Sequence, residues 1–329
     1  MPAAPAAALA RRSVWVAAGA VAALIVVSLF VGVLDIGLDA VLSDPETRRT
    51  FFLSRVARTA ALVLSGSALA VAGLIMQQLT QNRFVAPSTA GTVDAAAGGL
   101  LVAALFFAGS AVMWKVLFAL GFALAGTLLF VALIRRIQFR DPLLVPLTGI
   151  VLGGVYRAVA EFFAYRHNLT QSLSSWFVAD FSGIIAGRYE TLWFAGAVAV
   201  AAYVFANRFT AAGMGEAFAT SIGVNYRLTM LVGLGIASLA TAVVVVTVGS
   251  IPFLGLVVPN VVSLSLGDNV RRVLPVTAML GASVVLFCDI VGRLVIAPYE
   301  VAVGVIVGVI GSGVFLVLVL RRGHRYAAG

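Results

Sequence analysis

Residues 57–79 read ARTAALVLSGSALAVAGLIMQQL, and this stretch decides the fold class of the protein. Arg58 is its only charged residue. About 20 consecutive, mostly apolar residues are enough for a helix to cross the hydrocarbon core of a bilayer. Because no water is present there to satisfy backbone polar groups, a helix is the form that such a segment adopts. The stretch therefore predicts a transmembrane helix.

The composition of the whole chain points the same way. Of its 329 residues, 62% are apolar and 11% are charged, whereas soluble domains average about 45–50% and about 25%. So few charges cannot cover a water-facing surface, which excludes a soluble enzyme, a disordered chain and a disulfide-stapled secreted domain. Cys288 is the single cysteine, so no disulfide can form within the chain.

Working outward from residues 57–79, further apolar runs predict an all-α polytopic membrane protein of about ten transmembrane helices. A short run, Phe253–Leu266, contains Pro259 and has about half the spanning length. The ten runs are Val14–Leu34, Ala57–Leu79, Gly91–Ala108, Val112–Ile134, Pro142–Tyr165, Thr191–Phe205, Leu228–Val248, Phe253–Leu266, Val273–Ile296 and Val301–Leu320.

The distribution of charge predicts that both termini are cytoplasmic. With the N-terminus inside, thirteen basic residues fall in cytoplasmic segments and eight outside, in line with the positive-inside rule. The net charge of +9 is dispersed along the chain, so membrane lipid is the expected polyanionic neighbour and nucleic acid is not a partner.

The loops between the runs are too short for a second domain, so we expect residues 1–329 to form a single transmembrane domain. We expect a cytoplasmic tail at 1–12, an external interfacial helix region at 167–190 and a cytoplasmic loop at 208–227.

Lys115 is the only lysine and follows Trp114, so the chain has no phosphate-binding G-x-x-x-x-G-K-[ST] loop of its own. Two histidines, in unrelated positions, predict no metal site. Transport is the class of function that remains. We expect the chain to have no catalytic residues and to bind no cofactor directly.

Three motifs carry a family resemblance. The first is Ser54–Arg58 with Leu64–Gln78 and the sequence Asn82-Arg83-Phe84-Val85-Ala86-Pro87. The second is Gly249–Asn260, and the third runs from Leu274 through Asp289-Ile290-Val291-Gly292-Arg293 and Pro298-Tyr299-Glu300 to Gly304. In this order they cover most of the chain and resemble the FecCD family, the iron–siderophore and cobalamin permeases of ABC importers.

The resemblance implies a type II ABC importer permease fold in the bacterial cytoplasmic membrane. Such a subunit pairs with a second permease, receives substrate from a binding protein and rests on two separate ATPase subunits that bind ATP and magnesium. Asn82-Arg83-Phe84, Pro259-Asn260 and Phe287-Cys288-Asp289 look most like the petrobactin- and anguibactin-type branch. This implies a ferric siderophore of catecholate type as substrate and a different FecCD-type chain, or a second copy, as the pairing permease.

The resemblance also implies a docking role for Arg55, Arg58 and Arg293, which fall at the outer ends of predicted spans. Family members meet acidic residues of the binding protein at these positions, and the guanidinium fork suits bidentate carboxylate bonds. The alternatives are lipid headgroups and pairing within the chain, since Arg293 follows Asp289 by one helical turn.

The stretch Gly213–Gly223 resembles the family's coupling helix, which transmits ATPase closure to the spans. Two glycines permit a turn, Glu216 suits a first helical turn, and Gly223 suits a position just past a helix end. We expect a helix of about 8 residues whose Phe218 and Ile222 share a face. The coupling residues are Gly213, Gly215, Glu216, Ala217, Phe218, Ile222 and Gly223. An ordinary interfacial turn is the alternative.

Polar residues inside spans are costly and therefore candidates for function. The second span ends with Gln77, Gln78 and Asn82 and the third opens with Asp94, so we expect these to line the cytoplasmic gate. Other expected path residues are Pro259, Asn260, Gly311 and Gly313.

Two further expectations concern a charged pair and a set of aromatic residues. Arg157 and Glu161 have i,i+4 spacing and are expected to pair. Trp176, Phe177 and Phe181 are expected to anchor the external segment in the membrane interface, or to line an external vestibule.

Alternative functions stay open on the sequence alone. The same fold could import cobalamin or haem. An ion-gradient-driven transporter would use discontinuous helices and a midplane carboxylate. Phe253–Leu266 fits the first requirement, but no acidic residue lies within it.

Overall fold

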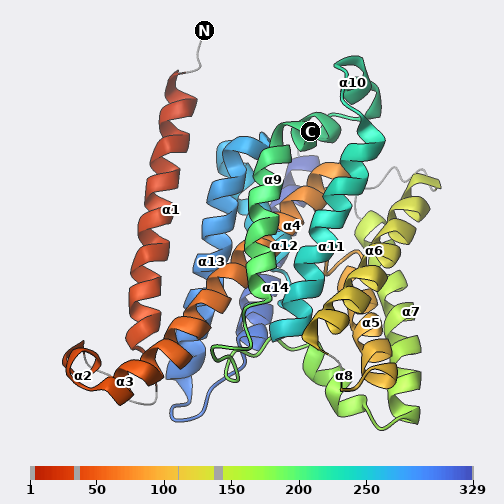
Figure 1. Cartoon of the computed structure of the whole chain (residues 1–329). Coiled ribbons are helices and arrows are strands. Elements are labelled where there is room, and N and C mark those ends of the chain that lie inside the picture. The colour runs from red at the N-terminus through yellow and green to blue at the C-terminus, as the bar shows by residue number, and fades with distance from the viewer. Residues whose placement is uncertain (1–3, 33–37, 110, 137–143, 328–329) are drawn as a thin grey trace.

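The computed structural model describes residues 4–32, 38–109, 111–136 and 144–327, and within these ranges every regular element is a helix (Figure 1). Eight helices contain segments long and apolar enough to cross a membrane. They are α1 (Ala4–Phe30), α4 (Ala57–Leu79), α6 (Val112–Arg136), α7 (Leu144–Arg166), α9 (Leu192–Gly213), α11 (Tyr226–Val248), α13 (Val270–Val295) and α14 (Val303–Ala327). The prediction of an all-α polytopic protein is confirmed.

Two apolar helices are shorter, α5 (Thr92–Phe106) and α12 (Leu254–Leu266). With them, the described chain contains the ten apolar segments that the sequence predicts. Both short helices follow backbone in the left-handed region: Gly91 (φ 74°) precedes α5 and Phe253 (φ 59°) precedes α12. Each therefore begins after a sharp turn, and non-helical backbone beside it is tolerated because it is buried in protein.

Five short helices complete the described chain: α2 (Leu38–Ser43), α3 (Pro45–Thr50), the π-helix η1 (Phe51–Val56), α8 (Thr170–Trp176) and α10 (Glu216–Ser221). Residues 45–79 run without a break from α3 through η1 into α4. A π-helical segment widens the helix by one residue per turn, and such segments are frequent at functional sites. Here it carries Arg55.

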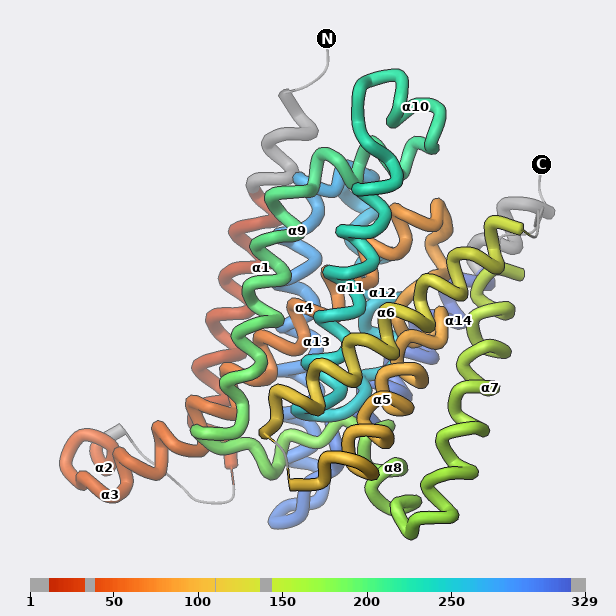
Figure 2. The backbone as a smooth tube through the Cα atoms, turned by 45° about the vertical axis from the view of Figure 1, so that its right-hand side comes forward, coloured from red at the N-terminus to blue at the C-terminus, as the bar shows by residue number. Residues whose placement is uncertain are grey.

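The short helices mark the two ends of the bundle. The beginning of α1, the end of α14 and α10 lie at one end, whereas α2, α3 and α8 lie at the other (Figures 1 and 2). This is the arrangement expected if both termini and the 208–227 loop share the cytoplasmic side. We refer to the α10 end as cytoplasmic and the α8 end as outer.

The first helix differs from its prediction. The expected span was Val14–Leu34, after a tail at residues 1–12. Instead α1 starts at Ala4 and ends at Phe30, and Leu34 lies outside the described residues. Alanine is the best helix former, so the alanines at positions 4 to 10 extend the helix. The apolar span itself covers Arg12–Phe30.

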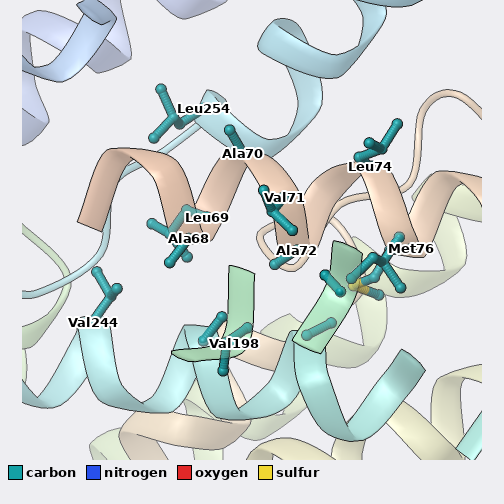
Figure 3. Close-up of a cluster of buried hydrophobic side chains, with 14 of the residues drawn as sticks. Ala68, Leu69, Ala70, Val71, Ala72, Leu74, Met76, Val198, Val244 and Leu254 are labelled. Atoms are coloured by element: carbon teal, nitrogen blue, oxygen red, sulfur yellow. The ribbon is translucent and has the colours of Figure 1, made fainter. Parts of the chain in front are cut away.

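The centre of the bundle is α4, which packs against α9, α11, α12 and α13. Figure 3 shows the small side chains on this helix, among them Ala68, Ala70 and Ala72, beside Val198 of α9 and Leu254 of α12. Two glycines allow the backbones to touch. A Cβ on Gly66 would lie 2.6 Å from the carbonyl oxygen of Gly281, and one on Gly73 only 1.8 Å from that of Gly255. Close approach of this kind is how membrane helices gain dispersion energy without a hydrophobic driving force.

Further glycines also act in packing. A Cβ on Gly149 of α7 would meet the Thr89 carbonyl oxygen at 2.1 Å, and one on Gly304 of α14 would meet the Ala179 nitrogen at 2.7 Å. Gly153 approaches Asp94 of α5 in the same way. These contacts are small-residue packing of the kind common between membrane helices.

Candidate translocation and docking sites

At the outer end, four charged side chains form what we call the outer charge cluster: Arg58 of α4, Asp289 and Arg293 of α13, and Glu300 from the following loop. The Arg58 Nη2 lies 2.7 Å from Asp289 Oδ1 and 2.8 Å from Glu300 Oε2. The Arg58 Nη1 also donates to Glu300 Oε1 at 3.1 Å. Arg58 therefore joins α4 to both ends of the connection between α13 and α14.

Arg293 lies deeper in the same cluster. Its Nη2 is 2.5 Å from Asp289 Oδ2 and donates to the Ser28 hydroxyl of α1 at 2.8 Å. Arg293 is 6% exposed and Asp289 is fully buried. Of the alternatives that the sequence left open for Arg293, pairing within the chain is therefore the one that the structure shows. A docking protein reaches this guanidinium only if the pair with Asp289 opens.

Arg55, on η1, lies nearer the surface and is half-buried. Its Nη1 donates to the carbonyl oxygen of Val31. A Cβ on Gly32 would overlap the Arg55 guanidinium, so a side chain at position 32 would displace the arginine from this bond. The three arginines expected to dock the binding protein, Arg55, Arg58 and Arg293, lie together at the outer end, and all three make bonds within the chain.

The rim beside this cluster is formed by α3. Asp44 caps the helix by accepting hydrogen bonds from the backbone N–H groups of Glu46 and Thr47. The Thr47 hydroxyl, followed by these backbone groups, holds the pKa of the Asp44 carboxyl below its usual range. Arg48 and Arg49 are exposed on the same helix, as are Asp44 and Glu46, so this part of the outer rim carries charges of both signs.

At the cytoplasmic end, α10 projects from the bundle between α9 and α11 (Figure 1). Gly215 (φ 107°) and Gly223 (φ 80°) flank it with backbone that side-chain-bearing residues rarely adopt. The helix has 6 residues, Glu216–Ser221, and is shorter than the predicted eight. It ends early because the Gly223 and Val224 N–H groups close back onto Thr220 and Ala219.

Large apolar side chains are exposed on α10 and directly beside it, next to the exposed polar residues Glu216, Thr220 and Ser221. Phe218 is 43% exposed and Ile222 54% exposed. Met214, just before the helix, is 64% exposed. Ala217 is also exposed, and Gly213 closes α9, where a Cβ would lie 2.4 Å from Gln78 Oε1. Exposed apolar side chains of this kind on a projecting helix suit a groove on another protein.

Beside α10 is a cavity of about 710 Å³, lined by the ends of α4, α6, α10 and α11. Gln81, Arg135 and Glu216 give it a polar wall, and the Arg135 guanidinium lies 5.4 Å from the ring centre of Tyr226. Glu216 therefore lies at the border between the projecting helix and a hollow in the bundle.

The expected gate residues hold the turn after α4 against α12. Gln77 Nε2 donates to the Leu256 carbonyl at 3.2 Å, and Asn260 Nδ2 donates to the carbonyls of Arg83 and Leu256 at 2.7 and 2.8 Å. Asn82 Oδ1 accepts from the Phe84 N–H at 2.8 Å. These side chains fix the short helix α12 to the turn, and none of the three is exposed.

The remaining expected path residues occupy different environments. Gln78 reaches the Asp268 carbonyl at 3.5 Å, at the cytoplasmic surface. Pro259 is buried inside α12. In α14, a Cβ on Gly311 would lie 2.7 Å from Phe253 Cβ, whereas one on Gly313 would meet nothing within 4 Å. Gly311 is therefore a packing glycine, and Gly313 lies on the open face of α14.

The predicted pair between Arg157 and Glu161 is wrong. Arg157 of α7 instead pairs with Asp94 of α5: Nε and Nη2 lie 3.0 and 2.9 Å from Asp94 Oδ1. The helical spacing was suitable, but an aspartate on a neighbouring helix lies closer in the fold, and sequence spacing cannot reveal it. The Arg157 Cζ also lies 3.9 Å from the ring centre of Phe177, which the sequence did not link to it.

Asp94 also lies deeper than predicted. Arg157 is 13 residues after the first residue of α7 (157 − 144) and nine before the last (166 − 157). At 1.5 Å per residue these spacings are about 20 and about 13 Å. Since Asp94 lies beside both Arg157 and Gly153, which stands one turn nearer the start of α7, it is level with the middle of this helix and so within the membrane. The expectation that Asp94 lines the cytoplasmic gate is therefore corrected.

The external segment 167–190 also differs from its prediction. Phe181 is fully buried, while Trp176 and Phe177 are half-buried and pack against α5, α6 and α11. Phe181 therefore belongs to the outer core and does not anchor a helix in lipid headgroups, whereas the role expected for Trp176 and Phe177 stays a prediction. The regular helix in this segment, α8, has 7 residues.

No metal centre accompanies these sites in the described part of the chain, where no three His, Cys, Asp or Glu side chains are grouped as ligands. Two partners of predicted residues were missed: Glu300, which holds Arg58, and Ser28, which holds Arg293. Glu300 stands in a motif of the family pattern, but nothing in its spacing pointed to Arg58.

Comparison with protein-family models now adds to this geometry. Residues 20–321 match the FecCD transport family. The chain belongs to this family. Petrobactin import system permease protein YclN of Bacillus subtilis is 46% identical over 300 residues, which cover 91% of this chain and 95% of YclN. Petrobactin import system permease protein FatD of Bacillus anthracis is 41% identical, over 90% and 87% of the two chains. The chain is therefore a multi-pass bacterial inner-membrane permease of the ABC importer class.

Solved structures support the fold. A metal-chelate type ABC transporter in an inward-facing conformation superimposes with a TM-score of 0.80 at 21% identity, over 94% of this chain and 99% of that one. PsaBC from Streptococcus pneumoniae gives a TM-score of 0.62 at 12% identity, over 85% of this chain and 93% of the PsaBC chain. The type II ABC importer permease fold predicted for this FecCD chain is confirmed.

Proposed function

We propose that this FecCD chain is the membrane-spanning subunit of an ATP-driven importer that moves a ferric siderophore of catecholate type into the cytoplasm. The observation that carries the proposal is the 46% identity to a petrobactin import permease over almost the whole of both chains. The anguibactin permease FatD of Vibrio anguillarum, 42% identical over 82% of this chain, supports the same substrate class.

The power for transport comes from a separate pair of ATPase subunits, which bind ATP and magnesium. The exposed Phe218 and Ile222 of α10 enter a groove on one ATPase, and glycines 215 and 223 let the helix tilt with that groove. Closure of the ATPases is relayed through α9 and α11, which α10 connects, and the helices rock between outward and inward openings.

At the outer end, a siderophore-binding protein docks its acidic residues on the basic surface around Arg55 and Arg58. Glu300 holds Arg58 from the loop and is itself 25% exposed, so an incoming carboxylate can replace it. Arg293 supports this surface through Asp289 and becomes a docking contact only if that pair opens.

Between the two ends, the substrate passes along a cavity shared with a second permease, a different FecCD-type chain or a second copy. The exposed faces of α7 and α14 are the surfaces available for this pairing. Gln77, Gln78, Asn82, Pro259 and Asn260 hold the inner gate. Asp94 lies farther from the cytoplasm along the path, and Gly311 and Gly313 of α14 lie beside that path.

The decisive experiment reconstitutes the permeases in proteoliposomes with and without the ATPase, the binding protein outside and ATP inside. We expect ferric petrobactin uptake to require all components, to stop with vanadate and to persist with a protonophore. Uptake that needs only a proton gradient would instead support the secondary-transporter alternative. Preferential uptake of cobalamin or haem in competition would reassign the substrate.

Two variants test the named surfaces in the same assay. Phe218→Asp should abolish binding-protein-stimulated ATP hydrolysis while the folded permease still inserts. The double variant Arg55→Glu with Arg58→Glu should abolish binding-protein capture. Unchanged capture would remove the docking role, and unchanged ATP hydrolysis would remove the coupling role.

A further inference from the structure

The structure exposes one charged pair inside the membrane. The Arg157 side chain is 47% exposed, although it lies about 13 Å below the outer end of α7, while that of Asp94 is 12% exposed. An arginine that faces hydrocarbon at such depth costs about 2.5–3.5 kcal/mol on an insertion scale. The exposed half of Arg157 is therefore expected to face water or protein, and not acyl chains.

The same face of α7 carries a second charged residue, Glu161. Gly154, Arg157, Glu161 and Tyr165 follow one another at helical spacing and are all exposed. Glu161 makes no ion pair with any described residue, and it stands one turn outward from Arg157. A polar stripe of this kind on a membrane helix marks a water-filled route or a protein interface.

Arg157 is held in place, but its guanidinium keeps N–H groups that are not directed to Asp94. Two of its five N–H groups are directed to the single oxygen Oδ1 of Asp94. The flat face of the guanidinium lies 3.9 Å above the Phe177 ring, and Phe177 packs against α5, α6 and α11. The Asp94 carboxylate can approach α7 so closely only because Gly153 lacks a Cβ, which would lie 2.6 Å from Asp94 Oδ2.

We propose that Arg157 is a transient contact for the anionic groups of the ferric chelate on its way through the membrane, and that Asp94 sets the strength of this contact. The proposal rests on the proposed function. Catecholate ligands bring more negative charge to iron than its three positive charges neutralise, so the cargo is an anion. A guanidinium can donate to catecholate or carboxylate oxygens.

The role of Asp94 follows from the need for release. A bare arginine in a low-dielectric passage would hold an anion strongly. With Asp94 bound to it the pair carries no net charge, and Glu161 adds a negative charge one turn outward. The free N–H groups can therefore still orient the chelate while the attraction stays weak enough for departure. Asp94 and Arg157 should therefore affect retention of the chelate in opposite directions.

The experiment measures retention as well as transport. The complete importer, with its ATPase, is solubilised and loaded by the binding protein with ferric petrobactin that contains radiolabelled iron. We expect Arg157→Gln to lower the iron retained about tenfold, the factor that loss of one charged hydrogen bond gives. Asp94→Asn should raise retention by a similar factor, and both variants should slow uptake into proteoliposomes.

Further variants separate this role from a structural one. Arg157→Lys keeps the charge and should retain more iron than Arg157→Gln. The double variant should behave like Arg157→Gln, since Asp94 acts through the arginine. Arg166→Gln, at the exposed end of the same helix, is the matched control and should leave retention unchanged.

The outcomes distinguish the two proposals. If the wild-type importer moves no ferric petrobactin, the proposed function fails. If the wild-type importer does move ferric petrobactin, but Arg157→Gln and Asp94→Asn shift the retained iron in the same direction or not at all, only the role of Arg157 is overturned. Loss of the second permease from purified Arg157→Gln would identify the stripe as a contact between permeases and would also overturn the role.

Discussion

Helices α4 and α7 have the same length, 23 residues, but opposite environments. In the most apolar window of α4, 78% of the residues are buried within the chain, whereas in α7 the share is 22%. Small residues on α4 bring four other helices against it, while α7 packs mainly through Gly149 and Gly153. Hence α4 holds this subunit together, and the open face of α7 is completed by something outside the chain.

The largest expected effect tests this contrast with one substitution in each helix. Gly73→Val should cost more than about 3 kcal/mol, since the added side chain meets the Gly255 backbone and neither helix can move away. Gly154→Val on α7 has nothing within 4 Å of the new Cβ and should change stability by less than about 0.5 kcal/mol. Unfolding by sodium dodecyl sulfate, followed by circular dichroism, measures both. Equal losses would show that α7 is not an open helix.

Ion pairs should show the same contrast between buried and exposed regions. Asp289→Asn removes the shared acid of the outer charge cluster and leaves two largely buried arginines with Glu300 alone, so we expect a loss of about 3–5 kcal/mol. Asp268→Asn breaks the exposed pair with Arg83, whose atoms are 2.6 Å apart. Its loss should be below about 1 kcal/mol. The same unfolding assay compares them, and a small loss for Asp289→Asn would leave Arg293 free to act in docking.

The sequence predicts those structural features that depend on residues close together in the chain, and it misses those that depend on which helices pack together. Apolar length predicts the ten segments, and the glycines of α10 predict a short helix between turns, because both follow from neighbouring residues. The partner of Arg157 depends on which helices pack together, and so Asp94 could not be recognised from its position in the chain. The prediction for Phe181 was wrong for the same reason. An aromatic residue near the end of a membrane helix is equally suited to lipid headgroups and to a protein core.

Helix α14 contains both environments within one turn. Gly311→Ala should destabilise the chain by about 1–3 kcal/mol, since its Cβ would lie 2.7 Å from that of Phe253. Gly313→Ala adds a methyl group in open space and should stabilise the helix by up to about 1 kcal/mol. Thermal unfolding in detergent reports both. If Gly313→Ala is as harmful as Gly311→Ala, the open face of α14 is already packed within the single subunit.

The smallest effects on stability are expected from the loss of helix caps. The comparison here is between α13, a helix of the core, and α3, a short helix at the outer rim. Asn269 caps α13 by accepting from the Arg272 N–H at 3.2 Å, and Asn269→Ala should lower the stability of the whole subunit by about 1 kcal/mol. Asp44 caps the six-residue α3 at the outer rim, so Asp44→Ala should leave global unfolding unchanged and speed hydrogen exchange only at Glu46 and Thr47.

Acidification distinguishes the Asp44 cap from a mere loop contact. The pKa of Asp44 is lowered in the folded chain, chiefly by the Thr47 hydroxyl, so the cap stabilises α3 at every pH above the unfolded value of about 3.9. That stabilisation is lost as the pH falls through the lower folded value. Protection at Thr47 should therefore be constant from about pH 5 to 8 and decline in acid, and in Asp44→Ala the decline should be absent. A decline that persists in the variant would place the titrating group elsewhere on the rim.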